Sequence, residues 1–294
     1  MINSAVMEFT PVARLPLLCS KTGETGQTAL RGTTVRYTLL GPLEVVTDEG
    51  RSISFTASKA TQVLALLLTR CGQTVTVETI IEELWGDQPP TTAMPTLQTY
   101  VYHLRRRLRR EGANGAELLA TRSRGYEICV EPEQVDEKVF ERLVECAGAQ
   151  IDHDPEAALK SVTEALVLWR GPALASVHKG EVLAAHVTRL EEMRARAESI
   201  RIQAKRSLGR HHEIVPELRS LVARYPLNES LHAWLIEALY RSGRRAEALG
   251  AYRDLWSRLD VELGVAPSRE AQLLQRAILE LDDVRVPVRA RRKG

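Results

Sequence analysis

The sequence predicts a mostly α-helical protein with a small β component: a strand-containing helical domain followed by an all-helical repeat domain. Three observations predict this order. Three short strand-like segments precede the first helix, three amphipathic helices and a hairpin follow, and the second half repeats itself at a period of 34 residues. A 34-residue period is typical of tetratricopeptide-like helix hairpins.

Length, composition and cysteine usage indicate a soluble globular protein rather than a secreted or membrane one. The 294 residues suffice for two domains, and 44% of them are apolar and 27% charged, with a net charge of +2. The four cysteines lie far apart without a CxxC pair, which argues against a zinc ribbon or a disulfide framework. The longest apolar run, 63–68, is too short to span a membrane, so we expect a cytoplasmic protein.

The N-terminal half is divided by a change in pattern near Val35. Residues 1–34 lack a sustained helical or strand period, which predicts a disordered leader. Residues 35–131 form the first predicted domain. It opens with VRYTLLGPLEVV, which we interpret as two strands around a Gly41-Pro42 break, and with RSISF as a third.

Two capped helices follow the strands. Ser58 can cap a helix over KATQVLALLLTRC, and Thr76 can cap one over VETIIEELW. In the second helix, one predicted apolar face carries Ile80, Ile81, Leu84 and Trp85. The other face is predicted to carry Glu78, Glu82 and Glu83, near the positive N-terminal end of the helix.

The third helix, predicted over 92–110, has two contrasting faces. Leu97, Val101, Leu104 and Leu108 are spaced four, three and four residues apart, so they form one core-facing stripe. The opposite face is polar, aromatic and basic; it carries Pro95, Thr99, Tyr102, Arg106 and Arg110, with Thr96 and His103 at its flank. After a Gly/Asn break, ELLATRSRGYEICV is expected to form a hairpin whose tip is Arg122–Gly125.

Charge is strongly segregated along the chain. Residues 92–130 hold seven arginines against three glutamates, whereas residues 131–165 hold ten acidic residues against three basic ones. The near-neutral chain therefore contains a basic segment beside an acidic one.

The second domain, predicted over 132–282, is a helical repeat. At an offset of 34 residues, Gly209, Arg210, Glu213, Arg219, Leu221 and Arg224 recur as Gly243, Arg244, Glu247, Arg253, Leu255 and Arg258. Such units stack their apolar faces on one another. Trp169, Trp234 and Trp256 fit helical patterns and are expected to serve packing. Residues 283–294 are expected to be a disordered basic tail.

Several segments in order resemble a known family. LGPLEV, LALLL, ELWGDQPP, LQTYVYHLRRRL and TRSRGYEI are similar to the marked segments of the OmpR-type winged helix. A helical-repeat domain directly behind that fold is the layout of the Streptomyces antibiotic regulatory proteins, whose second half is the bacterial transcriptional activation domain. The resemblance covers residues 35–281. It implies an activator that binds short direct repeats near the −35 promoter element and recruits RNA polymerase to a biosynthetic gene cluster.

The resemblance and the helix geometry together predict a double-stranded DNA-binding surface. The front of the third helix would enter the major groove, where arginine can contact guanine and threonine methyls can contact thymine. Arg105, Arg107 and Arg109 would lie toward phosphates. The predicted DNA-binding residues are Thr96, Gln98, Thr99, Tyr102, His103, Arg105, Arg106, Arg109, Arg122 and Arg124. The alternative for each is an ordinary solvated surface, and Lys59 is equally a phosphate contact or an idle surface lysine.

By the same resemblance, the loop between the second and third helices is expected to contact the polymerase at its sigma factor. Asp87, Gln88 and Pro89 are the exposed candidates, and Trp85 is expected to fill the core. We expect a monomer or weak dimer that becomes a side-by-side homodimer on DNA. No cofactor, metal site or catalytic motif is predicted, so an enzyme is not expected. Two alternatives stay open: a repressor on the same fold, and a helical-repeat adaptor whose DNA binding is incidental.

Overall fold

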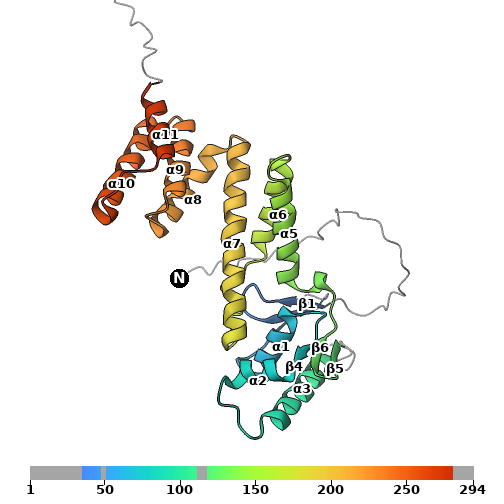
Figure 1. The fold of residues 1–294 in the computed structure, drawn as a ribbon. Helices are drawn as coiled ribbons and strands as arrows, with labels where there is room; N and C mark the ends of the chain where they lie inside the picture. Colours follow the sequence, from blue (N-terminus) through green and yellow to red (C-terminus); the bar gives the residue numbers. More distant parts are fainter. Residues whose placement is uncertain (1–34, 48–50, 111–117, 281–294) are drawn as a thin grey trace, which may run out of the picture. The chain divides into compact units, whose positions relative to one another are not determined.

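The computed structural model describes residues 35–47, 51–110 and 118–280. Its N-terminal part contains two small antiparallel sheets and three helices (Figure 1). The first sheet has the order β1-β2-β3 and the second has the order β4-β6-β5. The elements are β1 (Val35–Thr38), β2 (Glu44–Thr47), β3 (Ser52–Ser54), α1 (Lys59–Thr69), β4 (Val75–Thr76), α2 (Val77–Trp85), α3 (Ala93–Arg110), β5 (Leu119–Arg122) and β6 (Gly125–Ile128).

Both predicted helix caps are confirmed. The Ser58 hydroxyl accepts a hydrogen bond from the Thr61 amide at 3.2 Å, and the Thr76 hydroxyl accepts one from the Thr79 amide at 3.2 Å. Each hydroxyl satisfies one of the amides that the first helical turn leaves without a partner. Local sequence chemistry therefore starts both α1 and α2.

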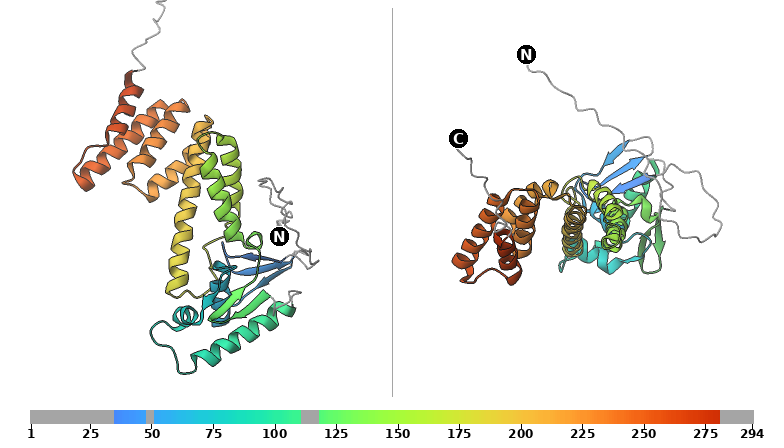
Figure 2. Two further views of the ribbon diagram at one scale, coloured as in Figure 1. Left: turned by 45° about the vertical axis from the view of Figure 1, so that its right-hand side comes forward. Right: turned by 90° about the horizontal axis from the view of Figure 1, so that it is seen from above.

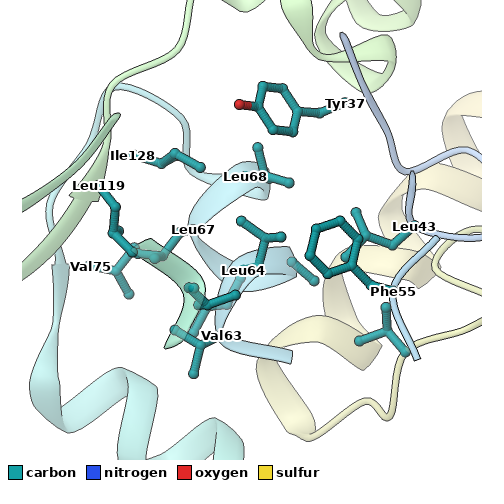
Figure 3. Close-up of a cluster of buried hydrophobic side chains, with 14 of the residues drawn as sticks. Tyr37, Leu43, Phe55, Val63, Leu64, Leu67, Leu68, Val75, Leu119 and Ile128 are labelled. Carbon is teal, nitrogen blue, oxygen red and sulfur yellow. The ribbon is translucent and has the colours of Figure 1, made fainter. Parts of the chain in front are cut away.

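Helix α1 is the centre of the N-terminal core. Every residue from Thr61 to Thr69 is buried. Figure 3 shows Leu64, Leu67 and Leu68 among side chains from both sheets, including Tyr37 and Ile128. A helix that is apolar on all sides needs cover on all sides, and α2, α3, α7 and β6 contact it.

Helices alone make up the second half, apart from connecting turns (Figure 2). Its helices are the short 3-10 turn η1 (Pro132–Gln134), α5 (Asp136–Gln150), α6 (Pro155–Val167), α7 (Glu181–Ser207), α8 (His211–Arg224), α9 (Glu229–Arg241), α10 (Arg245–Leu263) and α11 (Arg269–Glu280). No helix within the described residues is long and apolar enough to cross a membrane.

The 34-residue repeat corresponds to two helix hairpins, α8–α9 and α10–α11. Gly209 and Gly243, which are 34 residues apart, precede α8 and α10 with φ values of 71° and 76°. A left-handed backbone is readily adopted by glycine, so it ends one helix and allows the next to turn back. Both hairpins share a common buried core.

The two halves are more closely joined than their sequence patterns indicate. Leu174 and Val177, from the α6–α7 connection, belong to the same buried cluster as α1. The backbone after β1 is held by that connection: the amides of Arg170 and Leu174 donate to the carbonyls of Leu40 (2.8 Å) and Leu39 (2.9 Å). The α6–α7 connection therefore completes the core of the N-terminal part.

Asp136 at the start of α5 also contacts the segment after β1. Its carboxylate accepts hydrogen bonds from the amides of Leu39 (2.7 Å) and Leu40 (3.1 Å). Burial raises the pKa of Asp136 to about 6, although these two hydrogen bonds favour the charged carboxylate. The carboxyl group thus joins β1 to α5 across 97 positions of sequence.

Glu83 belongs to the predicted polar face of α2, but it is buried by a contact that the helical pattern does not indicate. Glu83 is only 2% exposed, and its carboxylate accepts hydrogen bonds from the amides of Gly180 (2.6 Å) and Leu183 (3.0 Å) at the start of α7. Gln62 Nε2 donates to the same carboxylate at 2.8 Å. Because Gly180 has no side chain, Glu83 supplies the capping acceptor of α7 from another part of the chain.

The tryptophans do not all pack as predicted. Trp169 is half-buried and lies edge-to-face on Phe140, with ring centroids 5.6 Å apart, and Trp234 is half-buried against the α8–α11 core. Trp256 on α10 is instead 47% exposed. The helical period of the sequence identifies a face, but the neighbours that cover that face are set by tertiary packing.

Candidate nucleic-acid interface

Helix α3 has the two faces that its sequence predicts. Leu97, Val101, Leu104 and Leu108 are all at most 3% exposed. On the opposite side Thr99, Tyr102, His103 and Arg106 are exposed, with Tyr102 exposed by 60%. The apolar stripe packs the helix onto α1, so the polar front stands on a rigid support.

The leading end of α3 is continuous despite Pro95. Proline lacks an amide hydrogen and is tolerated in a first turn, where amides have no helical partner. The amide of Thr96 donates to the carbonyl of Thr92 at 3.0 Å, and the Thr99 hydroxyl donates to the Pro95 carbonyl at 3.0 Å. Gln98 is exposed and Thr96 is half-buried, so Gln98 is the better presented of the two.

Arginines along α3 divide into two groups. Arg106 and Arg109 are exposed, and their guanidinium groups have no hydrogen-bond or ion-pair partner among the residues that the structure describes. Arg105 instead donates to the Leu119 carbonyl (2.9 and 2.7 Å) and to Thr121 Oγ1 (2.8 Å). It therefore ties α3 to β5, and its guanidinium is already engaged within the protein.

Arg107 has a similar structural role. Its guanidinium lies 4.3 Å from the centre of the Phe55 ring and donates to the Ser54 carbonyl at 2.8 Å. These contacts attach α3 to the end of β3, where a phosphate contact was expected. In the LRRRL segment, Arg105 and Arg107 therefore contact other parts of the protein, whereas Arg106 between them faces solvent.

The β5–β6 hairpin presents its arginines differently. Arg124 is exposed at the turn and has no side-chain partner among the described residues. Arg122 forms an ion pair with Glu127 at 2.7 Å, and this hydrogen bond holds the pKa of the Glu127 carboxyl below its usual range. Tyr126 of β6 is only 6% exposed and packs in the N-terminal core. Arg124 is therefore the freer cation of the hairpin.

Hairpin and helices are fastened together through backbone contacts. The Val77 amide at the start of α2 donates to the Arg124 carbonyl at 3.1 Å, and Val75 and Thr76 pair with Tyr126 and Gly125. With the Arg105 contacts, they set the hairpin at one position beside α3. Thus hydrogen bonds tie the hairpin both to α3 and to the start of α2.

Lys59 has a role that neither sequence-based alternative describes. Its Nζ donates to the Leu84 carbonyl at the end of α2 and lies 4.9 Å from the centre of the Trp85 ring. A cation here satisfies a carbonyl that the helix leaves without a partner. Trp85 is half-buried against the N-terminal core, in agreement with its expected packing role.

The α2–α3 loop lies at the same end of the N-terminal part as α3 (Figures 1 and 2). Gly86 ends α2 with φ of 59°, and its amide donates to the Glu82 carbonyl at 2.7 Å. Asp87, Gln88 and Pro89 are all exposed. The loop is therefore accessible beside the candidate DNA-binding face.

Sequence reasoning missed the residues that position this interface. Glu83, just before the loop, and Thr121, which receives Arg105, gave no local signal because their partners lie far away in the sequence. No group of three or more His, Cys, Asp or Glu side chains able to hold a metal occurs in the described part of the chain.

A winged helix with an exposed basic recognition helix, fused to a helical repeat, defines a DNA-binding transcription regulator. Comparisons with known proteins agree. Residues 50–128 match the family described as "Transcriptional regulatory protein, C terminal", and residues 135–279 match the "Bacterial transcriptional activator domain".

Relatives extend over most of the chain. It is 40% identical to the regulatory protein DnrI of Streptomyces peucetius over 84% of this chain and 93% of that protein. It is 33% identical to the transcriptional regulator RedD of Streptomyces coelicolor, over 86% of this chain and 73% of that protein. The chain belongs to the Streptomyces antibiotic regulatory protein family.

Longer relatives share only this region. The chain is 37% identical to the regulatory protein AfsR of Streptomyces griseus but spans 25% of that protein. A solved structure of Mycobacterium tuberculosis EmbR, in complex with a low-affinity phosphopeptide, superimposes with a TM-score of 0.75 at 30% identity. The match covers 85% of this chain and 66% of EmbR. The winged-helix and helical-repeat layout is thus shared, and this chain is a transcription regulator of that type.

Proposed function

We propose that this chain is a transcription activator that binds directly repeated operator sequences and recruits RNA polymerase to promoters of a biosynthetic gene cluster, with antibiotic genes as its targets. The observation that carries the proposal is the placement of two exposed cations, Arg106 on α3 and Arg124 on the hairpin, neither of which has a partner among the described residues. In this proposal the α3 front reads bases in the major groove, and the hairpin tip contacts the backbone or minor groove.

Individual roles follow from exposure and partners. Gln98, Thr99, Tyr102, His103 and Arg106 face solvent and are proposed to meet base edges, with half-buried Thr96 beside them. Arg109 and Arg124 are proposed phosphate or groove contacts, because their charges are not engaged within the described protein. Arg122 keeps a weaker role, since Glu127 already neutralises part of its charge. The whole surface rests on the α1 core.

Specific DNA binding is the first test. Replacing Arg106 and Arg124 together by alanine removes one base contact and one backbone contact, and is expected to weaken binding to the chain's own operator by about 100-fold or more. Footprinting and gel shifts at near-physiological salt measure this, because phosphate contacts alone give strong binding at low salt.

A charge-matched control is available in the repeat domain. The Arg269→Ala/Arg276→Ala variant loses the same two charges from exposed sites on α11 and is expected to bind as the wild type does. If both double variants lost the same operator affinity, the effect would arise from net charge alone and not from the two proposed contacts. On a duplex with two direct repeats, light scattering should detect two protomers; one protomer at saturation would contradict the side-by-side dimer.

Recruitment of polymerase is tested at the α2–α3 loop. Asp87→Ala/Gln88→Ala should leave operator binding unchanged, because both side chains are exposed and lie outside α3. Transcription from the operator-containing promoter with purified polymerase holoenzyme should fall several-fold relative to the wild type. A decrease in transcript on adding the wild-type protein would instead favour the repressor.

The adaptor alternative makes a different prediction. If the helical-repeat domain alone carried the function, the Arg106→Ala/Arg124→Ala variant would still support target-gene expression in cells. The interlocked core and Glu83 contact argue against that separation, because the winged helix and the repeat domain depend on each other for packing.

A further inference from the structure

Exposed apolar side chains gather in the last two helices. Trp256 and Leu263 of α10 are 47% and 56% exposed, and Leu273 and Leu279 of α11 are 53% and 47% exposed. The outermost unit of a helical repeat array is usually polar on its outer side, because no further unit covers it. The α10–α11 hairpin departs from that expectation.

The repeat itself explains why Trp256 is exposed. At the offset of 34 residues, Trp256 corresponds to Val222 of α8, which packs against the buried core of α8–α11. Helix α10 contacts α9 and α11, and lies at the outer edge of the group in Figures 1 and 2. Trp256 therefore occupies a stacking position that nothing in the described residues covers.

One stripe of α10 is nearly symmetric about Trp256. Leu249, Arg253, Trp256, Asp260 and Leu263 follow one another at spacings of four, three, four and three residues. The last four are exposed, whereas Leu249 is half-buried and packs partly against the α8–α11 core. This spacing places all five on one face of the helix, as in the seam of a coiled coil. In either direction along the helix, the order is a leucine, a charged residue, the tryptophan, a charged residue and a leucine. The two charged residues have opposite signs.

We propose that this α10 stripe is a self-association surface that binds a second copy of the chain by an antiparallel, two-fold contact. With the axis at Trp256, Leu249 of each copy faces Leu263 of the other, and the two Trp256 rings meet. Arg253 of each copy faces Asp260 of the other, so the contact contains two ion pairs, one on each side of the axis. Charge complementarity thus selects a second copy as the occupant.

The contact is distinct from the dimer proposed on DNA. Direct repeats relate two protomers by translation, whereas the α10 stripe relates them by a half-turn. The stripe therefore pairs free chains, or chains bound at separate operators. Because a single helix pair buries a small area, the association is weak and depends on protein concentration.

The test measures self-association of the full chain without DNA. Sedimentation velocity over a concentration series should show a reversible monomer–dimer equilibrium for the wild type. Trp256→Glu places a charge at the axis and should weaken dimerisation about 30-fold or more, the loss typical of a central aromatic residue. Circular dichroism checks that each variant keeps its helix content.

A charge exchange tests the two-fold geometry. Arg253→Asp alone and Asp260→Arg alone each place like charges opposite one another, so each variant should be monomeric. Their equimolar mixture should dimerise again, because each copy then pairs unlike charges with the other. Arg258→Asp, on the opposite side of α10, is the matched control and should dimerise as the wild type does.

Three results would overturn the proposal. The first is a wild type that stays monomeric at every concentration. The second is a mixture of the two charge variants that fails to regain the dimer. The third is a Trp256→Glu variant that dimerises normally but loses polymerase-dependent transcription, since the stripe would then face the polymerase. Operator binding by Trp256→Glu is expected to be unchanged, so failure here leaves the DNA-binding proposal intact.

Discussion

Replacing Glu83 by glutamine is expected to lower the free energy of unfolding by about 3 kcal/mol. The buried carboxylate accepts from two amides of the first turn of α7 and from Gln62. An amide has the same shape but only one acceptor oxygen, so its NH₂ group would face an amide donor. A hydrogen-bond donor that is left buried without a partner accounts for the cost.

Thermal unfolding measures the loss of stability, and the neighbouring residue supplies the control. Glu82 is exposed on the same helix, so Glu82→Gln should melt within a degree or two of the wild type. Gly180→Ala tests the same contact from the other side, because a Cβ there would lie 2.3 Å from the Glu83 carbonyl oxygen. If the Glu83→Gln and Glu82→Gln variants had the same melting temperature, the Glu83 carboxylate would not be what joins α2 to the start of α7.

Replacing Gly125 by alanine is expected to destabilise the protein by about 3 kcal/mol or more, through loss of the β4–β6 pairing. A Cβ at this position would lie 1.9 Å from the Val75 carbonyl oxygen, far inside contact distance. The obstacle is backbone on a paired strand, so it cannot move without breaking the ladder between β4 and β6. The hairpin would lose its fixed position beside α3.

The measurement combines stability with DNA binding. The Gly125→Ala variant should melt earlier and bind its operator more weakly, because Arg124 is no longer held beside α3. Gly250→Ala is the matched control. Gly250 is inside helix α10 with nothing within 4 Å of an added Cβ, so alanine there should raise stability by about 0.5–1 kcal/mol. If Gly125→Ala melted at the same temperature as the wild type, the β4–β6 pairing would not be needed for stability.

Much of the fold could be predicted because the determining interactions are local. The hydroxyls of Ser58 and Thr76 each accept a hydrogen bond from the amide three residues further along the chain. The α3 stripe repeats every three or four residues. The front of α3 follows from the same period, since burying one face exposes the opposite one. Thr99, Tyr102 and Arg106 are therefore exposed as their spacing predicts.

The exceptions are residues whose partners are distant in the sequence. Arg105 and Arg106 are neighbours of the same type, but one reaches Leu119 and Thr121 on β5 and the other reaches solvent. Similarly, Glu82 and Glu83 look alike in the sequence, and only Glu83 meets the start of α7. Helical periodicity describes the direction of a side chain but contains no information on the element that it meets.

By itself, the sequence determined the order of the first three strands, the three helices and the hairpin, the two helix caps, the two faces of α3, the 34-residue repeat and the family resemblance, but not the short strand β4. Each of these depends on residues within a few turns of one another or on a repeated pattern. Only the tertiary structure decided that Glu83 caps α7, that Asp136 holds the segment after β1, and that Trp256 lies at the surface. These roles arise from contacts or missing neighbours between segments as far as 100 positions apart, and such pairings exist only once the chain has folded.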